Sequence, residues 1–283
     1  MAIASAALAY RRNALMSANK VTTKAPSADV LAARENFAAF CTVMGKAPAK
    51  HMLEWHNELC TGVDTECLLG IGGPNTAILA PRGSAKSTVL GLFAAWMIGR
   101  HAAAKQMLRI LYIAYMVDIS RAKSATIKGV LNSAKYREIF PMVRLSKIKR
   151  SDEYWSIDYE FAGIDTAGEE AFTVACGGLK GAITSKRSQL VLIDDPIKSA
   201  ASINNPDIRR EMEQTWSNVI APTMFQGARA ICLGTRFHFD DIHATLFVPK
   251  NNWKQIIQKA VITDEDGRSR SYWPEFWSMK YLK

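Results

Sequence analysis

The stretch Ala-Pro-Arg-Gly-Ser-Ala-Lys-Ser-Thr, residues 80–88, lies between an apolar run at 76–79 and a run of helical pattern at 89–98. A loop between a strand and a helix directs backbone N–H groups toward the helix start, where phosphate oxygens bind. The usual pattern is G-x-x-x-x-G-K-[ST]; Lys86 and Ser87 hold its last two places, and Ala80 and Ala85 replace its glycines. This partial match predicts nucleotide binding only if a second element supports it.

The loop retains the groups that phosphate chemistry needs. Lys86 has the reach for the β- and γ-phosphates, and the Ser87 hydroxyl suits Mg²⁺. Arg82 adds a second cation, and Gly83 adds one flexible residue. The residues predicted to bind nucleotide are Pro81, Arg82, Gly83, Ser84, Ala85, Lys86, Ser87 and Thr88.

Two carboxylates supply the second element. The apolar run at 189–193 reads as a buried parallel strand, and it leads directly into Asp194 and Asp195. Ligands of open α/β sheets bind at the carboxyl ends of the strands, so the loop and both carboxylates should meet at one edge. Asp194 is suited to hold Mg²⁺ and Asp195 to orient or deprotonate an attacking water. The alternative is a turn that merely ends a strand.

A third strand end follows at 230–238, where a buried run leads into Gly234, Thr235 and Arg236. An Arg after a small Gly-Thr pair could sense the γ-phosphate and pass its loss to a moving element. A plain turn from strand to loop is a fair alternative for Gly234 alone. The order of loop, carboxylate strand and Gly-Thr-Arg strand is harder to obtain by chance than any one of them.

Together these residues resemble the ATPase domain of the large terminase subunit of tailed bacteriophages, over roughly residue 37 to the C-terminus. The resemblance rests on residues 81–88, 190–196 and 233–238, with Asp240 and Asp241 after them. It implies that Arg82 and Lys86 contact phosphate, that Ser87 and the Walker-B carboxylate Asp194 bind Mg²⁺, and that ATP is the nucleotide. The catalytic residues that it implies are Asp195, Lys86 and Arg82.

The resemblance also assigns a place to two further segments. Asp195 stands where the family usually has a catalytic Glu, with a side chain one methylene shorter. Gly234, Thr235 and Arg236 fall in the motif that couples hydrolysis to DNA movement. Residues 53–56 loosely resemble a segment that packs on adenine.

The implied fold is α/β, a mostly parallel sheet flanked by helices, as in P-loop NTPases of the additional-strand catalytic-glutamate type. Alternating strand and helix patterns agree with it. We expect an N-terminal arm at 1–29, a P-loop ATPase domain at 30–262 and a linker at 263–283. In the family such a linker leads to an RNase H-like nuclease domain, for which no residues remain here. Either the chain is an excised ATPase domain or the nuclease is encoded elsewhere; we favour excision and expect no nuclease activity from this chain alone.

The resemblance implies a motor that packages viral genomes. Its expected partners are double-stranded DNA, a small terminase subunit, the portal protein of a procapsid and further copies of itself in a ring. We expect a viral protein of the host cytoplasm that is neither secreted nor inserted in a membrane.

Composition is compatible with a partner rich in phosphate. The chain has 283 residues, with 36 Lys and Arg against 26 Asp and Glu, and a formal net charge of +10. The densest basic stretch is 135–150, which could contact DNA phosphates or supply an arginine finger to a neighbouring subunit. Such a charge balance is also common in proteins that never touch nucleic acid.

A possible metal motif, His238-x-Asp240-Asp241-x-His243, fits no common zinc spacing, and its two carboxylates more simply begin a helix.

Two other functions remain open on the sequence. A helicase-like, DNA-remodelling ATPase would share every motif named above. A non-hydrolysing nucleotide-binding scaffold with a decayed loop is motivated by Ala80, Ala85 and Asp195. The sequence keeps Lys86, Ser87 and Asp194 together, which argues against a decayed loop.

Overall fold

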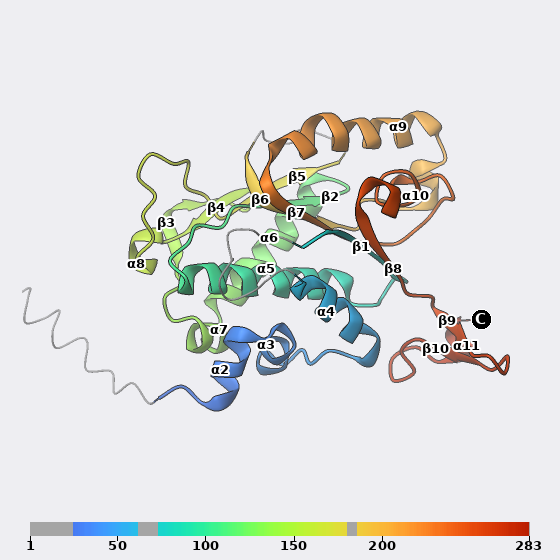
Figure 1. Cartoon of the computed structure of the whole chain (residues 1–283), viewed down its shortest axis with the longest axis horizontal. Coiled ribbons are helices and arrows are strands. Elements are labelled where there is room, and N and C mark those ends of the chain that lie inside the picture. Colours follow the sequence, from blue (N-terminus) through green and yellow to red (C-terminus); the bar gives the residue numbers. More distant parts are fainter. Residues whose placement is uncertain (1–24, 62–72, 180–185, 283) are drawn as a thin grey trace, which may run out of the picture.

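The computed structural model describes residues 25–61, 73–179 and 186–282. Its main feature is an eight-stranded sheet of order β3-β4-β5-β2-β6-β7-β1-β8, in which β4 pairs antiparallel with β3 and β5 and all other pairs are parallel (Figure 1). The strands are β1 (Asn75–Leu79), β2 (Ile110–Ala114), β3 (Leu145–Arg150), β4 (Tyr154–Ile157), β5 (Val174–Gly178), β6 (Ser188–Asp194), β7 (Met224–Gly234) and β8 (Trp253–Ile257). The expected mostly parallel sheet is confirmed.

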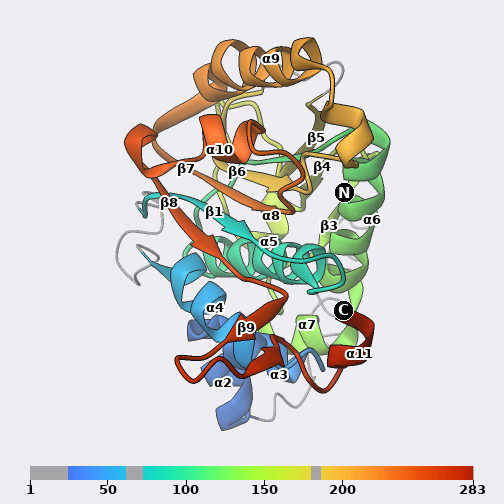
Figure 2. The ribbon, with the colours of Figure 1, turned by 90° about the vertical axis from the view of Figure 1, so that its right-hand side faces the viewer.

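Helices cover both faces of this sheet (Figures 1 and 2). One layer holds α2 (Ala28–Glu35), α3 (Phe37–Val43), α4 (Leu53–Cys60), α5 (Lys86–Ala103), α6 (Val117–Asn132) and α7 (Ala134–Ile139). The opposite face carries α9 (Pro206–Thr215) and α10 (Ile242–Thr245). Shorter elements are α8 (Tyr159–Ala162), α11 (Met279–Leu282) and a hairpin of β9 (Val261–Thr263) and β10 (Ser269–Ser271).

Strand β6 explains why the sheet needs two helical layers. Leu190 and Leu192 join the core beneath α5, whereas Val191 and Ile193 join the core beneath α9. Successive strand residues point to opposite faces, so an unbroken apolar run is stable only when both faces are covered. The continuous pattern of β6 therefore belongs to a central strand of an α/β sandwich.

The strand order brings the sequence motifs together. β7 lies between β1 and β6, with Leu79 opposite Gly234 and Asp194 opposite Leu233. A further strand thus separates the strand before the loop from the strand that ends at Asp194, in agreement with the additional-strand arrangement that the resemblance implies. Because the three strands are parallel, their carboxyl ends and the loops that follow them meet at one edge of the sheet.

Some element boundaries differ from the sequence prediction. The helix expected at 89–98 begins at Lys86 and continues to Ala103, buried between the sheet and the N-terminal helices. Of the predicted arm at 1–29, residues 1–24 lie outside the described residues, and α2 already begins at Ala28. Within the described ranges, no helix is both long enough and apolar enough to span a bilayer.

Arg229 anchors the N-terminal helices to the sheet. Its side chain is fully buried on β7, and burial lowers the pKa of its guanidinium to about 10, against the opposing effect of Glu58. Every N–H donor that it uses meets an oxygen of α4 or of the start of β1: Leu59 O at 3.0 Å, Thr61 O at 2.9 Å, Glu58 O at 3.0 Å, Pro74 O at 2.8 Å and Thr76 Oγ1 at 2.9 Å. One side chain thus ties the end of α4 to the strand that precedes the loop.

We expect Arg229→Met to lower the free energy of unfolding by roughly 3–5 kcal/mol, because buried carbonyl oxygens lose their donor and the Glu58 carboxylate loses one of its two cation partners. Urea unfolding followed by circular dichroism measures the change. Arg210→Met, at an exposed pair with Asp207, is the matched control and should stay within about 0.5 kcal/mol of the parent. Equal losses in the two variants would contradict the anchoring role.

Candidate functional site

The loop between β1 and α5 has two residues in the left-handed backbone region. Gly83 has φ 75°, and Ala85, directly before the helix, has φ 62°. The Ser84 hydroxyl donates to Pro81 O at 2.7 Å and closes the turn. Ala85 occupies the place where the usual motif has its second glycine, and the left-handed φ at this position explains why glycine suits it.

Lys86 lies at the centre of the site. Its Nζ donates to the backbone oxygens of Ala80 (3.1 Å) and Pro81 (2.9 Å) and to Thr235 Oγ1 (3.0 Å), and it lies 3.8 Å from Asp195 Oδ1. The residue is only 4% exposed. Burial lowers the pKa of the ammonium, while the two aspartates at the end of β6 oppose this shift. The amino group of Lys86 thus lies at the helix start, where phosphate oxygens bind.

Asp194 accepts a hydrogen bond at each carboxylate oxygen. Ser87 Oγ donates to Oδ1 at 2.8 Å, and the Tyr112 hydroxyl donates to Oδ2 at 3.0 Å. The carboxylate is 1% exposed; burial raises its pKa, whereas the Ser87 bond, the charge of Lys123 and the Tyr112 bond lower it. A carboxylate beside a hydroxyl offers the hard oxygen ligands that Mg²⁺ prefers, so these residues fit that ion.

Asp195 differs from its neighbour in both backbone and exposure. Its φ is 41°, which turns the chain out of the sheet after β6, and its side chain is 43% exposed. The left-handed region is accessible to Asp at low cost. Two adjacent carboxylates thus have different environments, since Asp194 is buried and held by hydroxyl donors while Asp195 reaches solvent beside Lys86.

The three residues of the Gly-Thr-Arg segment have different surroundings at this edge of the sheet. Thr235 lies in the site, where its hydroxyl contacts Lys86 and donates to Ala80 O at 3.2 Å. Gly234 packs directly against His243, whose ring atoms lie 2.7 Å from the position of an added Cβ. Arg236 is exposed, and its guanidinium donates to backbone oxygens of its own loop. The structure therefore brings Thr235, but not the Arg236 side chain, to Lys86.

Arg82 lies at the rim of the site. Its Nη2 donates to Lys198 O at 2.6 Å, and its guanidinium carbon lies 4.9 Å from the centroid of the Phe237 ring. These contacts link the loop to the segments that follow β6 and β7. A cation–π contact of this kind holds a guanidinium without neutralising its charge.

These groups surround a pocket of about 410 Å³. Its lining consists of Arg82, Gly83, Ser84, Ala85, Lys86, Ser87, Thr88, Tyr115, Ile119, Asp195, Ile197, Lys198 and Phe237. Except for Pro81, every loop residue that the sequence predicted to bind nucleotide lines it. Sequence reasoning missed the side of the pocket formed by α6 and by the segment after β6.

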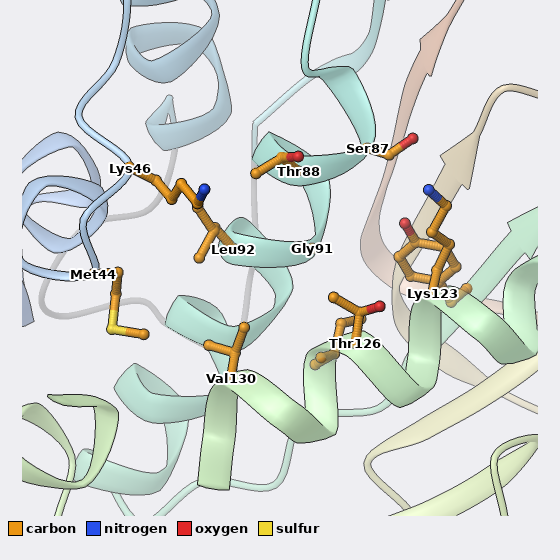
Figure 3. Close-up of a pocket in the computed structure, with 11 residues that line it drawn as sticks. Met44, Lys46, Ser87, Thr88, Gly91, Leu92, Lys123, Thr126 and Val130 are labelled. Atoms are coloured by element: carbon orange, nitrogen blue, oxygen red, sulfur yellow. The ribbon is translucent and has the colours of Figure 1, made fainter. Parts of the chain in front are cut away.

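A second pocket of about 330 Å³ adjoins the first through Ser87 and Thr88 (Figure 3). It lies between α5 and α6, with Tyr112 among its lining residues. Figure 3 shows the Lys123 side chain rising from α6 toward Ser87, in agreement with its electrostatic effect on Asp194. Neither Tyr112 nor Lys123 belongs to a recognisable motif. A tyrosine inside an apolar strand nevertheless indicates a buried hydroxyl that needs a hydrogen-bond partner.

The segment that loosely resembled an adenine site lies in the core. Trp55 is fully buried, and His56 is 3% exposed with its ring centroid 4.5 Å from that of Phe37. Neither residue lines the pocket around Lys86. An aromatic contact from the opposite end of the chain reaches the loop instead: Trp277 Nε1 donates to Gly83 O at 3.3 Å.

The possible metal motif is a helix start, as the sequence favoured. Asp241 is the N-cap of α10; its carboxylate accepts from His243 N at 3.0 Å and from the backbone N–H groups of Phe237 (3.0 Å) and His238 (3.1 Å). In the described part of the chain, no group of three or more His, Cys, Asp or Glu side chains is placed to hold a metal ion. Asp241 instead holds the loop that carries Phe237 against Arg82.

We expect Ala85→Gly to raise the free energy of unfolding by up to about 1 kcal/mol, because glycine adopts the left-handed φ without a Cβ penalty. Ala94→Gly, in the buried interior of α5, is the matched control and should lower it by roughly 1 kcal/mol or more. Chemical denaturation measures both. Destabilisation by Ala85→Gly would contradict the conclusion that the backbone of Ala85 is strained.

A pH dependence follows from His243. Burial lowers its pKa from 6.5 to about 4, so the unfolded chain binds more protons in this window and stability is lost as the pH falls through it. We expect His243→Gln to make the decline in the free energy of unfolding between these pH values shallower, by on the order of 1–3 kcal/mol. Urea titrations across the window test it, and parallel profiles for parent and variant would contradict it.

No protein-family model and no curated protein matches the sequence. Among solved structures, the chain is similar to the ATPase domain of the large terminase of Thermus phage P74-26, with 14% identity over 78% of this chain and 85% of that one and a TM-score of 0.46. It is also similar to the large terminase of a thermophilic bacteriophage in complex with ATP-γ-S (11% identity, 68% of this chain, 40% of that chain, TM-score 0.41). The N-terminal domain of the phi29 DNA packaging ATPase is a third (14% identity, 72% and 92%, TM-score 0.39). All three come from bacteriophages, as does the family that the motifs resemble, but at such identities and TM-scores the likeness carries no argument about function.

Proposed function

We propose that the chain is a Mg²⁺-dependent ATPase that couples hydrolysis to movement of double-stranded DNA into a procapsid. The hydrogen bond of 2.8 Å between Ser87 Oγ and Asp194 Oδ1 carries the hydrolytic part of the proposal. It joins a phosphate-type loop at a helix start to the carboxylate at the end of β6, the strand on the other side of β7 from β1. Phosphoryl transfer needs this pairing of anion-binding backbone and metal-binding oxygens.

The positive groups of the loop bind and orient the phosphates. Lys86 is buried and bonded to neutral oxygens of Ala80 and Pro81, which anionic phosphate oxygens replace as stronger acceptors. Arg82 stands at the rim and supplies a second cation. Both residues neutralise charge that develops as the terminal phosphate leaves.

The two aspartates take different roles because their environments differ. Asp194, buried beside the Ser87 hydroxyl, holds Mg²⁺ together with that hydroxyl. When bound, the ion supplies positive charge at the β- and γ-phosphate oxygens. Asp195 reaches solvent and lies on the Lys86 side of the pocket, where it orients or deprotonates the attacking water.

Thr235 links this chemistry to movement. Its hydroxyl accepts a hydrogen bond from Lys86. A change in the hydrogen-bond partners of Lys86 therefore alters the contacts of Thr235, directly after β7. The following residues, Arg236 and Phe237, belong to the loop that covers the rim of the pocket. Release of the γ-phosphate would change these contacts and so move the loop.

The DNA-packaging part of the proposal rests on the resemblance of the motifs and on the charge of +10. It includes a small terminase subunit, a portal protein, assembly into a ring and action in the host cytoplasm. A helicase-like ATPase would share the site, and binding to a procapsid portal separates the two.

Mg²⁺-dependent ATP hydrolysis, with and without double-stranded DNA, tests the site. We expect Lys86→Ala and Asp195→Asn each to reduce kcat by roughly 10²-fold or more, because each removes a group that acts in the transition state. Lys250→Ala and Asp207→Asn change the same residue types at the surface and should retain the parent rate. Stimulation by DNA would favour the motor.

A non-hydrolysing scaffold predicts a different result. It would bind ATP tightly in the presence of Mg²⁺ and hydrolyse none, even at protein concentrations that favour assembly into a ring. Loss of nucleotide binding in Lys86→Ala would still identify the site in that case. Hydrolysis that survives both substitutions would overturn the assignment altogether.

A further inference from the structure

A groove of about 400 Å³ lies at the edge of the sheet remote from β8, between the edge strand β3 and the second half of α6. Its lining consists of Lys128, Asn132, Leu145, Ser146, Lys147, Lys149, Arg150 and Trp155. Half of these residues are cations, and none is acidic. The groove therefore concentrates positive charge in a concave surface.

Two of the cations are held in place by the protein. Lys128 pairs with Asp152 and donates to Arg150 O at 3.1 Å, and Lys149 donates to Ala171 O at 2.6 Å. These contacts hold the two ammonium groups in place. Lys128 and Lys149 therefore have defined positions in the groove.

The other two cations, Lys147 and Arg150, have no partner within the described ranges. Within the described ranges, the side chains of Lys147 and Arg150 make no hydrogen bond, ion pair or ring contact, and both residues are exposed. The register of β3 against β4 shifts between Leu145 and Arg150. Such an irregularity re-aims side chains, which explains how residues of both parities on β3 line one groove.

Neutral donors accompany these cations. Ser146 Oγ already accepts from the backbone N–H groups of Ile148 (3.2 Å) and Lys149 (3.4 Å), so its hydroxyl proton points elsewhere. Asn132 Oδ1 accepts from Arg137 at 3.1 Å, which leaves its amide N–H groups as donors. Donors of this kind beside Lys and Arg are the usual partners of phosphate oxygens in nucleic-acid backbones.

The groove shares a helix with the nucleotide site. Ile119 of α6 lines the pocket around Lys86, Lys123 reaches toward Ser87, and Lys128 and Asn132 line the groove. Lys123 and Lys128 are separated by about 7.5 Å along the helix axis, from the rise per residue. A ligand in the groove thus contacts the same rigid element as a nucleotide.

We propose that this groove binds the sugar-phosphate backbone of double-stranded DNA, with Lys147 and Arg150 as its phosphate contacts. The inference deepens the proposed function and rests on it for the choice of duplex DNA. Lys147 and Arg150 are unpaired cations and no carboxylate is among the lining residues, which favours a polyanion over an acidic protein surface. The Ser146 hydroxyl and the Asn132 amide, the remaining donors, match single phosphate oxygens. Contacts of this type carry no sequence preference and release counterions.

The test measures binding of a fluorescently labelled blunt duplex by anisotropy over a range of salt concentrations, with no nucleotide present. We expect Lys147→Gln combined with Arg150→Gln to weaken binding roughly tenfold at low salt and to reduce the slope of log K against log salt by about 2. Lys250→Gln combined with Lys259→Gln makes the same change in charge at other exposed positions and should leave both quantities nearly unchanged.

A charge-conserving pair, Lys147→Arg with Arg150→Lys, separates charge from folding and should bind as the parent does. Equal weakening by the groove and control pairs, or no binding of the duplex by the parent at low salt, would overturn the inference. Because binding is measured without ATP, a groove that binds DNA in a chain that never hydrolyses ATP would refute only the ATPase. Hydrolysis without duplex binding would refute only the groove.

Discussion

The site depends on the insertion of β7 between β1 and β6. Parallel strands in register end at one edge, so the pairing of Leu79 with Gly234 and of Leu233 with Asp194 places three loops side by side. Arg229, on the same strand, ties the opposite end of β1 to the N-terminal helices. β7 thus sets the position of the loop, the carboxylates and the threonine at once.

The environment of each charged group follows from this placement. Burial disfavours the charged forms of Lys86 and Asp194, and both remain tolerable because hydroxyl and carbonyl partners surround them. Asp195 escapes burial because its left-handed backbone turns the chain away from the sheet. Neighbouring residues of one type are thereby separated into a metal-binding candidate and a candidate base.

Helix α6 is the element that sequence reasoning undervalued. Its face toward α5 lines both pockets near Ser87, and its second half lines the basic groove beside β3. Helical periodicity is a local property of the α6 segment, and nothing in that pattern indicates which neighbours its polar residues meet. Lys123 and Lys128 look alike in the sequence, and packing alone separates one near the carboxylates from one at the groove.

The sequence by itself determined the alternation of strands and helices, the loop at 80–88 and the carboxylates at a strand end, because periodicity and short-range spacing are local properties. The same locality explains its failures. Gly178, the last residue of β5, is required by a contact that no local pattern shows, because an added Cβ would lie 2.6 Å from Val117 N at the start of α6. The contacts of Tyr112, Arg82 and Trp277 join segments distant in the chain. Only the tertiary structure could decide them, since they depend on strand order and packing that no local pattern encodes.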